Sequence, residues 1–515
     1  VKYGYYKLTK DLIGNAWYQS ENGIGGSIWK NESGDTGFRG TLDGNGFTIQ
    51  ETFYVTGLFG YVGKGAVIKN ITFNVNKYAN DKEYMLFGYS MVGATLENVN
   101  VNVTHQTDDG RTEIKESVVS GLLTGIFAYG NTFNNVVVDA RDTDIDTLFG
   151  SCVYYGYTGS AANTFDKDCK VVAKSLLGLA CINNAEGIKK TDSAFISDAD
   201  NLTVAKVGEA KWFNNEIVLP NVTGNDYSVN LGDYTTAATI LPATFGGEAV
   251  TYEKGTLTLT DEFKNNTQKH GNRNLCLIVE KDGKYYNVKT QVLVVTNEIK
   301  SAADWSVLAS DKYTDNKLYG YYRLSGDIGS EYNSAWINGG MDVGYDVEGT
   351  KGFKGTLDGN GHTVYAVIMT PGIIGSVGSG AVIKNISIVS AYYDNSYQMV
   401  IGPRVAYANF QDVNITVNAY KTGTTPGTAY GLLTQYYCYS STFTNVTIDV
   451  KTPFASLLGA SCSEIWARGN TFSNCTLKYK DDNSLGLYAN WKKEDGTLAS
   501  SYPLSWVQGI TVKKV

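Results

Sequence analysis

The sequence of 515 residues lacks several patterns that mark common protein classes. Its seven cysteines are widely spaced, contain no Cys-x-x-Cys pair and make an odd total, which argues against a zinc site and a disulfide framework. Cys169 and Cys475 fall at core-facing strand positions, so we expect them to be small buried hydrophobic residues. No stretch approaches the roughly 18 consecutive apolar residues of a membrane-spanning helix, so we expect no direct membrane insertion within this sequence.

Basic clusters and catalytic histidine patterns are also missing. Lysine and arginine never gather beyond a few residues and the formal net charge is -8, so we expect no nucleic acid partner. The three histidines, His105, His270 and His362, lie in different contexts and give no Ser/His/Asp or metal-triad spacing. No signal pattern opens the chain, so we expect any export signal or anchor to lie outside it.

A bias toward strands and tight turns runs through the composition. Glycine (57) and tyrosine (37) are abundant while charged residues make up only 18%, which predicts an all-β protein. Four phrases also occur twice in the same order, which indicates two homologous modules. The paired phrases are 3–8 (YGYYKL) and 319–324 (YGYYRL), 37–49 and 352–364, 65–71 and 380–386, and 121–124 and 431–434.

Within each module a shorter repeat joins an apolar pair to a strand of the pattern apolar-x-(Asn/Asp)-apolar-x-apolar. The pairs begin at Leu58, Leu86, Leu122 and Leu148, and again at Ile373, Val400, Leu432 and Leu457. The strands begin at Ile68, Leu96, Phe133 and Phe165, and again at Ile383, Phe410, Phe443 and Phe472. Such a strand cannot bury its narrow apolar face alone, so the repeat predicts coils stacked on one another as a solenoid.

One polar residue recurs at a fixed place in each coil. There the alternation of apolar and polar residues shifts by one, which implies a bend in the strand. The amide side chains at these positions could stack and hydrogen-bond with the coils above and below, as a structural ladder. The positions are Asn70, Asn98, Asn135 and Asp168 in the first module, and Asn385, Asp412, Asn445 and Asn474 in the second.

The segment between the modules lacks the coil motif. It shows short alternating strands, such as 216–219, 255–259 and 292–295, separated by turn residues, which fits an immunoglobulin-like β-sandwich. A short helix with Ser301 as N-cap follows, where a solenoid needs its open end covered. We therefore predict a first solenoid over 1–195, the sandwich over 196–297, and a second solenoid over 298–515 with a short N-terminal capping helix.

The phrases GTLDGNG, GLFG and IKNITF resemble the repeats of large bacterial adhesin-like surface proteins. The resemblance implies that both solenoids are right-handed parallel β-helices and that the protein is extracellular, at a cell surface. Members of that family differ in what they touch, so the resemblance implies the scaffold and not the ligand. Their usual anchor and signal regions are missing from this sequence.

Two acidic patterns invite a chemical interpretation. The LDGNG turn places Asp43 and Asn45, and again Asp358 and Asn360, beside glycines, as some Ca²⁺ loops do, but a tight structural turn uses the same residues. We expect the turn, with no cofactor, and keep Ca²⁺ as the alternative. The run VVVDARDTDID offers several carboxylates to a lyase or hydrolase, but the second copy keeps only one acid there, so we expect a solvated charge run. Its residues are Asp139, Asp142, Asp144 and Asp146, with Arg141.

Tyrosine clusters are the candidate ligand-binding residues, because exposed aromatic faces beside Asn and Asp suit sugar rings or protein surfaces. Packing of these rings within the coils is the alternative. The clustered residues are Tyr154, Tyr155, Tyr157, Tyr392, Tyr393, Tyr436, Tyr437 and Tyr439.

The sequence thus predicts no enzyme and no catalytic residue. We expect a segment of an extracellular surface or adhesin-type repeat protein that binds glycans or a host or neighbouring-cell protein, or serves as a rigid spacer. One alternative is a carbohydrate-active β-helix enzyme of the lyase or tailspike kind. Another is a structural component of a virion or surface layer, in which copies of the chain contact one another.

Overall fold

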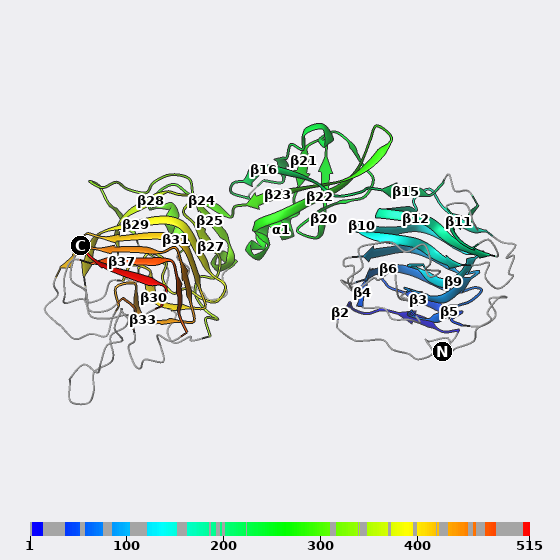
Figure 1. The fold of residues 1–515 in the computed structure, drawn as a ribbon, viewed down its shortest axis with the longest axis horizontal. Coiled ribbons are helices and arrows are strands. Elements are labelled where there is room, and N and C mark those ends of the chain that lie inside the picture. Colours follow the sequence, from blue (N-terminus) through cyan, green and yellow to red (C-terminus); the bar gives the residue numbers. More distant parts are fainter. Residues whose placement is uncertain are drawn as a thin grey trace, which may run out of the picture. The chain divides into compact units, whose positions relative to one another are not determined.

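A computed structural model describes most of the chain. It covers residues 3–13, 37–51, 57–75, 85–103, 121–151, 162–184, 187–191, 196–197, 201–222, 224–308, 316–337, 339, 348–368, 372–394, 399–418, 420–421, 431–451, 457–459, 469–479 and 508–515. The described residues are mainly β-structure, as the composition predicted (Figure 1). They form two compact units, the first made of Val1–Phe213, Asn230–Ala243 and Cys276–Thr290, the second of Asn214–Val229, Thr244–Leu275 and Gln291–Val515.

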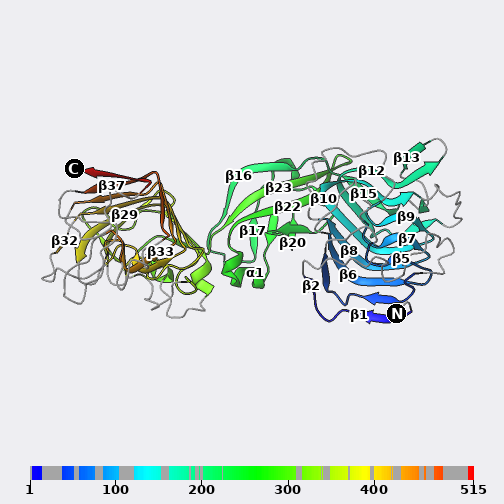
Figure 2. The same ribbon diagram turned by 60° about the horizontal axis from the view of Figure 1, so that its bottom comes forward.

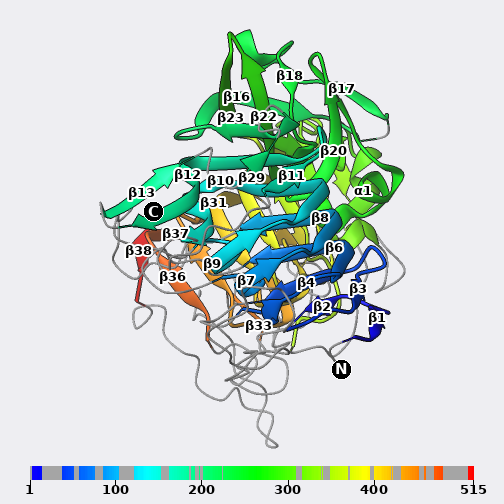
Figure 3. The ribbon, with the colours of Figure 1, turned by 90° about the vertical axis from the view of Figure 1, so that its right-hand side faces the viewer.

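The first unit is built on a 15-stranded sheet, called the first sheet below, whose described strands pair in parallel except for β12 with β13. Figure 3 shows β6, β8 and β10 in one column and β7 and β9 in another. The strands are β1 (Tyr5–Lys7), β2 (Leu12–Ile13), β3 (Thr41–Asp43), β4 (Thr48–Glu51), β5 (Gly60–Val62), β6 (Val67–Val75), β7 (Gly88–Val92), β8 (Thr95–Val103), β9 (Thr124–Tyr129), β10 (Thr132–Ser151), β11 (Asn163–Phe165), β12 (Lys170–Asn184), β13 (Gly187–Thr191), β14 (Ile196–Ser197) and β15 (Thr203–Lys206).

The second unit holds a 13-stranded sheet, the second sheet, with parallel pairs throughout, and a separate parallel pair, β30 with β33. Both parallel sheets curl (Figure 2). The strands are β24 (Asn297–Ile299), β25 (Tyr321–Leu324), β26 (Ala335–Ile337), β27 (Thr356–Asp358), β28 (Thr363–Ile368), β29 (Val382–Asp394), β30 (Gly402–Ala406), β31 (Asn409–Val417), β32 (Tyr420–Lys421), β33 (Thr434–Tyr439), β34 (Thr442–Thr444), β35 (Thr447–Val450), β36 (Thr471–Ser473), β37 (Cys475–Tyr479) and β38 (Ile510–Lys514). Two 3₁₀ helices, η4 (Asp304–Leu308) and η5 (Asn316–Tyr319), lie between β24 and β25 in the sequence.

The short repeat places equivalent residues side by side. Ile68 is in register with Leu96, and Ile383 with Phe410. In the second sheet this row of equivalent residues continues from Phe410 to Phe443, and the centroids of their rings lie 4.8 Å apart at an interplanar angle of 5°. The apolar pairs stack too, since the Leu58 amide donates to the Leu86 carbonyl at 2.8 Å. Each strand therefore buries its apolar stripe against its neighbours along the sheet.

The ladder position is a left-handed corner. Asn70, Asn98 and Asn135 have φ of 51°, 52° and 49°, a conformation that Asn tolerates better than most residues. The Asn98 amide donates to the Asn70 Oδ1 at 3.1 Å, and the Asn135 amide donates to the Asn98 Oδ1 at 2.9 Å. The second sheet has the same ladder of side-chain hydrogen bonds, in which Asn445 donates to Asp412 and Asn474 donates to Asn445, both at 2.8 Å. The bend and the ladder predicted from the sequence are confirmed at these positions.

The fourth coil of the first sheet departs from the prediction at Asp168. One more residue separates Phe165 from Cys169 than separates Phe133 from Val136, and the enlarged turn moves the carboxylate of Asp166 to the ladder. Asp166 accepts the Asn135 backbone amide at 2.9 Å and the Asp168 amide at 3.0 Å. Cys169 beyond this turn is buried and free, like Cys475 in the second sheet, as predicted.

The middle of the chain forms an eight-stranded sheet with antiparallel pairs. Its strands are β16 (Lys211–Leu219), β17 (Asp226–Ser228), β18 (Ala238–Thr239), β19 (Ala243–Phe245), β20 (Glu248–Glu253), β21 (Thr256–Thr258), β22 (Gly271–Lys281) and β23 (Lys284–Val294), with η2 (Gly232–Tyr234), helix α1 (Asp261–Asn265) and η3 (Thr267–Lys269) between them. Within the first unit, Leu241 and Ile278 of this region pack on Val172 and Ala205. Because β15 pairs in parallel with β12, the first sheet continues beyond the boundary predicted at 195.

Replacing Asn135 tests the left-handed corner. Asn135→Ala loses the ladder hydrogen bond. It also places alanine, which tolerates positive φ less well than asparagine, at this corner, so we expect the free energy of unfolding to fall by about 2 kcal/mol. Asn135→Gly loses the hydrogen bond without the steric strain and is expected to cost about 1 kcal/mol. Urea unfolding measures both, with Asn134→Ala as the control one residue away. Equal losses for Asn135→Ala and Asn135→Gly would contradict a strained corner.

Candidate functional site

The duplicated YGYY phrase places two tyrosines beside cationic side chains in each unit. In the second unit, the Lys354 ammonium lies 5.0 Å from the ring centroid of Tyr319, and Lys384 lies 5.4 Å from that of Tyr321. In the first unit, Arg39 lies 5.5 Å from the Tyr3 ring and Lys69 lies 6.0 Å from the Tyr5 ring. The four pairs are equivalent by repeat position, so both copies carry the same aromatic and cationic face.

Each inner tyrosine of this face is tied to the LDGNG turn. The Tyr5 hydroxyl donates to the Asp43 carboxylate at 2.6 Å, and the Tyr321 hydroxyl donates to Asp358 at 2.5 Å. The second carboxylate oxygen of each Asp accepts a backbone amide within the turn, from Asn45 or Asn360, at 2.9 Å. The turn thus holds the tyrosine hydroxyl in place.

These hydrogen bonds also set the ionisation of the two carboxylates. The Tyr5 hydroxyl, followed by the Asn45 amide, lowers the pKa of Asp43 to about 2. Burial raises the pKa of Asp358, but the Tyr321 hydroxyl and the Asn360 amide outweigh it, so this pKa is lowered as well. Both groups are therefore charged at neutral pH and already engaged by donors from the protein.

The four candidate Ca²⁺ ligands thus take part in a hydrogen-bonded turn. The Asn45 side chain donates to the Leu8 carbonyl at 3.5 Å, and that of Asn360 donates to the Leu324 carbonyl at 3.3 Å. Across the described parts of the chain, no group of three or more His, Cys, Asp or Glu side chains could hold a metal ion. Ca²⁺ binding at these turns stays a prediction.

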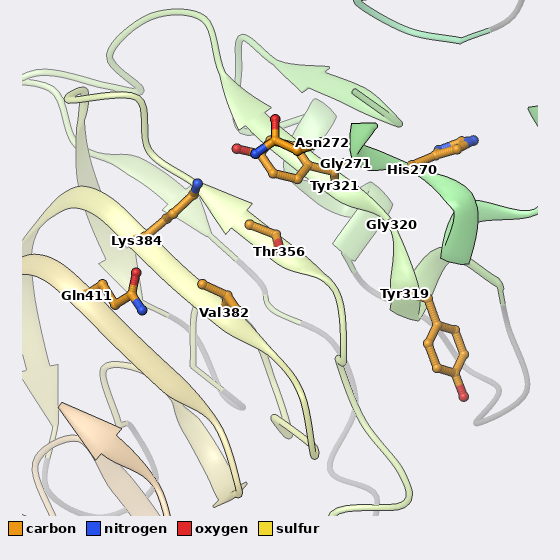
Figure 4. Close-up of a pocket in the computed structure, with 10 residues that line it drawn as sticks. All are labelled: His270, Gly271, Asn272, Tyr319, Gly320, Tyr321, Thr356, Val382, Lys384 and Gln411. Atoms are coloured by element: carbon orange, nitrogen blue, oxygen red, sulfur yellow. The ribbon is translucent and has the colours of Figure 1, made fainter. Parts of the chain in front are cut away.

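In the second unit the face becomes one side of a groove (Figure 4). Its volume is about 360 Å³, within the range of sites for small ligands. The floor carries Thr356, Lys384 and Gln411, which come from the adjacent strands β27, β29 and β31. The wall is the segment His270–Asn272 at the start of β22. No acidic residue is among the described residues that line the groove, although the Lys384 ammonium lies 3.4 Å from the Asp358 carboxylate. The groove thus presents an ammonium that is paired on one side, an amide and a hydroxyl group.

His270 attaches this wall to the second sheet. Its Nδ1 lies 2.8 Å from the Thr296 hydroxyl, which also accepts the Tyr321 backbone amide at 2.9 Å. Burial lowers the pKa of His270 below 6.5, so the native ring is neutral at pH 7. The neutral Nδ1 can accept the Thr296 hydroxyl proton, which leaves the hydroxyl oxygen free to accept from Tyr321.

The equivalent face of the first unit has no such wall among the described residues. Tyr3 and Tyr5 are 70% and 62% exposed there, whereas Tyr321 is 7% exposed. The register also shows one change of charge, since Glu97 stands beside Lys69 where Gln411 stands beside Lys384. The two copies therefore present related faces with different shape and charge.

The tyrosines proposed from the sequence lie elsewhere. Tyr154, Tyr155 and Tyr157 lie outside the described residues, and Tyr392 and Tyr393 belong to the C-terminal end of β29. The three tyrosines of β33 divide by exposure. Tyr437 is buried, Tyr436 is half-buried under the Arg404 guanidinium at 4.3 Å, and Tyr439 packs edge-on against Tyr407 at 5.6 Å. Ligand binding by any of these tyrosines stays a prediction.

The acidic run is only in part the solvated charge run that we expected, since the Asp142 side chain is 53% exposed but the other three acids are more buried. Asp139 pairs with Arg141 at 2.5 Å, and Asp142 pairs with Lys289 at 2.7 Å. Asp144 accepts the Ser175 hydroxyl at 2.5 Å, and Asp146 is fully buried. These residues lie on β10, which pairs with β12 along this stretch, and neighbours on β10, on β12 and in 276–290 supply the partners of Asp139, Asp144 and Asp142. Among the described residues, these carboxylates do not converge on a shared site.

The sequence pattern missed the tyrosines that the fold brings together with lysine. Tyr3, Tyr5, Tyr319 and Tyr321 all belong to the phrase that revealed the duplication, and their recurrence with a cation in GFRG and GFKG was the available signal.

Comparisons with protein-family models, curated proteins and solved structures found no match. Among the described residues, no helix is long and apolar enough to cross a membrane.

The pH dependence of stability tests the role of His270. A histidine whose pKa is lower in the folded than in the unfolded state stabilises the protein fully above the unfolded value of 6.5, and this contribution is lost as the pH falls through 6.5 and the folded pKa. We expect the urea midpoint of the second unit's transition to fall between about pH 7.5 and pH 5.5. His270→Gln should flatten that slope, and His362→Gln, at a half-buried histidine outside this contact, is the matched control. An unaltered slope in His270→Gln would contradict the assignment.

Proposed function

We propose that this chain is a non-enzymatic, extracellular surface protein of the adhesin type that binds glycans. In this proposal each parallel sheet is a right-handed parallel β-helix, and the middle sheet is an immunoglobulin-like domain between the two. The stacked parallel strands and the antiparallel middle sheet are compatible with that organisation. The scaffold presents its outward side chains to a ligand, while the inward ones hold the coils together.

The observation that carries the proposal is the duplicated tyrosine and lysine face, which becomes a polar groove in the second unit. A glycan offers ring hydroxyls to Gln411, Thr356 and Lys384, which are spaced one strand apart along the floor. Strands of a sheet lie about 4.8 Å apart, a spacing comparable to that of successive sugar units. Two such faces in one chain would also increase avidity for a repeating polymer.

An enzymatic function is less well supported by the same geometry. Most glycoside hydrolases need two carboxyl groups about 5 to 9.5 Å apart around the scissile bond. No carboxylate is among the described residues that line the groove, and nearby Asp358 is ionised and bound to Tyr321 and Lys384. The groove therefore favours binding over hydrolysis.

A glycan array probed with the whole chain tests the proposal. We expect binding to at least one glycan class, and at least a tenfold loss of affinity in Lys384→Gln and in Gln411→Ala, because each removes a floor group from a desolvated contact. Lys64→Gln, at an exposed lysine away from the floor, is the control. Lack of binding to any glycan, or binding that both floor variants retain, would contradict glycan binding in the groove. Release of shortened glycan would support the enzyme alternative.

A further inference from the structure

The floor of the groove continues along the outer face of the second sheet as two rows of side chains. Figure 4 shows Gln411 of β31 at the side of the groove opposite His270. Beyond β31 the sheet continues with β34 and then β36, which pair in parallel in the same register. The first row is Thr356, Val382, Asn409, Thr442 and Thr471, and the second row is Asp358, Lys384, Gln411, Thr444 and Ser473.

The inward residues between the two rows fix their orientation. The rings of Phe410, Phe443 and Phe472 stack with centroids 4.8 Å and 4.9 Å apart. Because side chains alternate along a strand, the residues on either side of each ring point away from the core. Each strand from β31 to β36 therefore presents two outward side chains to the surface beside the groove.

Beyond Lys384 both rows consist of uncharged side chains that can form hydrogen bonds. Thr442, Thr471 and Ser473 are exposed, and the others are half-buried. The Thr442 hydroxyl donates to the Asn409 Oδ1 at 3.0 Å, which links β31 and β34 within the first row. The rows thus continue the groove as an amide and hydroxyl surface.

The spacing of the second row suits a linear polymer. Neighbouring strands lie about 4.8 Å apart, so the five strands from β27 to β36 span about 19 Å. Within the described part of the chain, the side chains of Gln411, Thr444 and Ser473 form no hydrogen bond. A glycan that crosses the strands would therefore meet one available polar group per strand, as successive units of the polymer pass over the row.

The charges of the two rows favour an uncharged glycan. The Lys384 ammonium is paired with the Asp358 carboxylate at 3.4 Å, and neither row contains a further cation. An ionised sugar over β34 or β36 would lose its hydration without meeting an opposite charge in the rows. The first unit differs here, because Glu97 and Asp166 place carboxylates where the second row has an amide and a hydroxyl.

We propose that the groove and the two rows form one extended site for the interior of a linear, uncharged glycan. The glycan crosses the strands from β27 to β36, and a stretch of about five sugar units would cover them. This inference rests on the glycan-binding function proposed above, and it adds the class and the length of the ligand.

Calorimetric titration of the whole chain with oligosaccharides of increasing length tests the inference. The uncharged probes are cello-, xylo- and manno-oligosaccharides of two to six units, and oligogalacturonides of the same lengths are the ionised probes. For at least one uncharged series we expect the affinity to rise about tenfold from the trimer to the pentamer, because the longer chain reaches β34 and β36.

Two variants and a control locate the added contacts. Thr444→Val and Ser473→Ala each remove one hydroxyl group, so each should lower the affinity for the pentamer about threefold and leave that for the trimer unchanged. Thr447→Val is the matched control, at a half-buried threonine beyond the corner at Asn445, and should bind both lengths as the parent chain does.

The outcomes separate this inference from the proposed function. If the chain binds glycans on the array, the extended site is overturned by an affinity that stays constant beyond the trimer or by lack of binding to every uncharged series. Tighter binding of oligogalacturonides than of any uncharged series, or pentamer binding that the double variant Thr444→Val/Ser473→Ala retains in full, would also overturn it. Lack of binding to any glycan on the array would overturn the proposed function together with this inference.

Discussion

The structure depends on burying an apolar stripe that is too narrow to be stable in one strand. Ile68 and Ile383 each contribute one inward side chain to a strand whose opposite face is polar. Registered neighbours on both sides bury them completely, as Leu42 and Leu96 do for Ile68. The hydrophobic effect acts here along the stack of strands, so each described strand of the stack contributes to its neighbours' stability.

The corner at each asparagine makes this stacking compatible with a curled sheet. A strand alternates its side chains strictly, and a single residue at positive φ shifts the alternation so that apolar residues stay inside on both sides of the bend. The amide ladder joins successive corners, for example Asn445 and Asn474, by hydrogen bonds at 2.8 Å. Because the inward side chains alone form the core, outward residues such as Lys384 and Gln411 can be substituted without disturbing core packing.

The two copies differ in what surrounds this common scaffold. In the second unit, residues far apart in sequence, His270 and Thr296, attach a wall beside Tyr321, and the segment that includes Trp305 closes the end. In the first unit the same tyrosines stand exposed among the described residues. Duplication thus supplies two equivalent faces, and the connecting segment distinguishes them. Burial of His270, a consequence of the same contacts, couples one of these faces to pH.

The sequence by itself determined the all-β class, the duplicated phrases, the stacking of equivalent strands, and the bend with its amide ladder, because each of these features recurs as a periodic pattern of residue types. Asn98 and Asn445 could be assigned in this way, since a residue that bends the strand recurs wherever the strand recurs. Only the tertiary structure decided the partners of single side chains. The sequence does not show that Lys289 lies 2.7 Å from Asp142, or that Asn272 and Gln411 line one groove. Such contacts join segments without a shared period, so their geometry follows from how the chain packs in three dimensions and not from any local pattern.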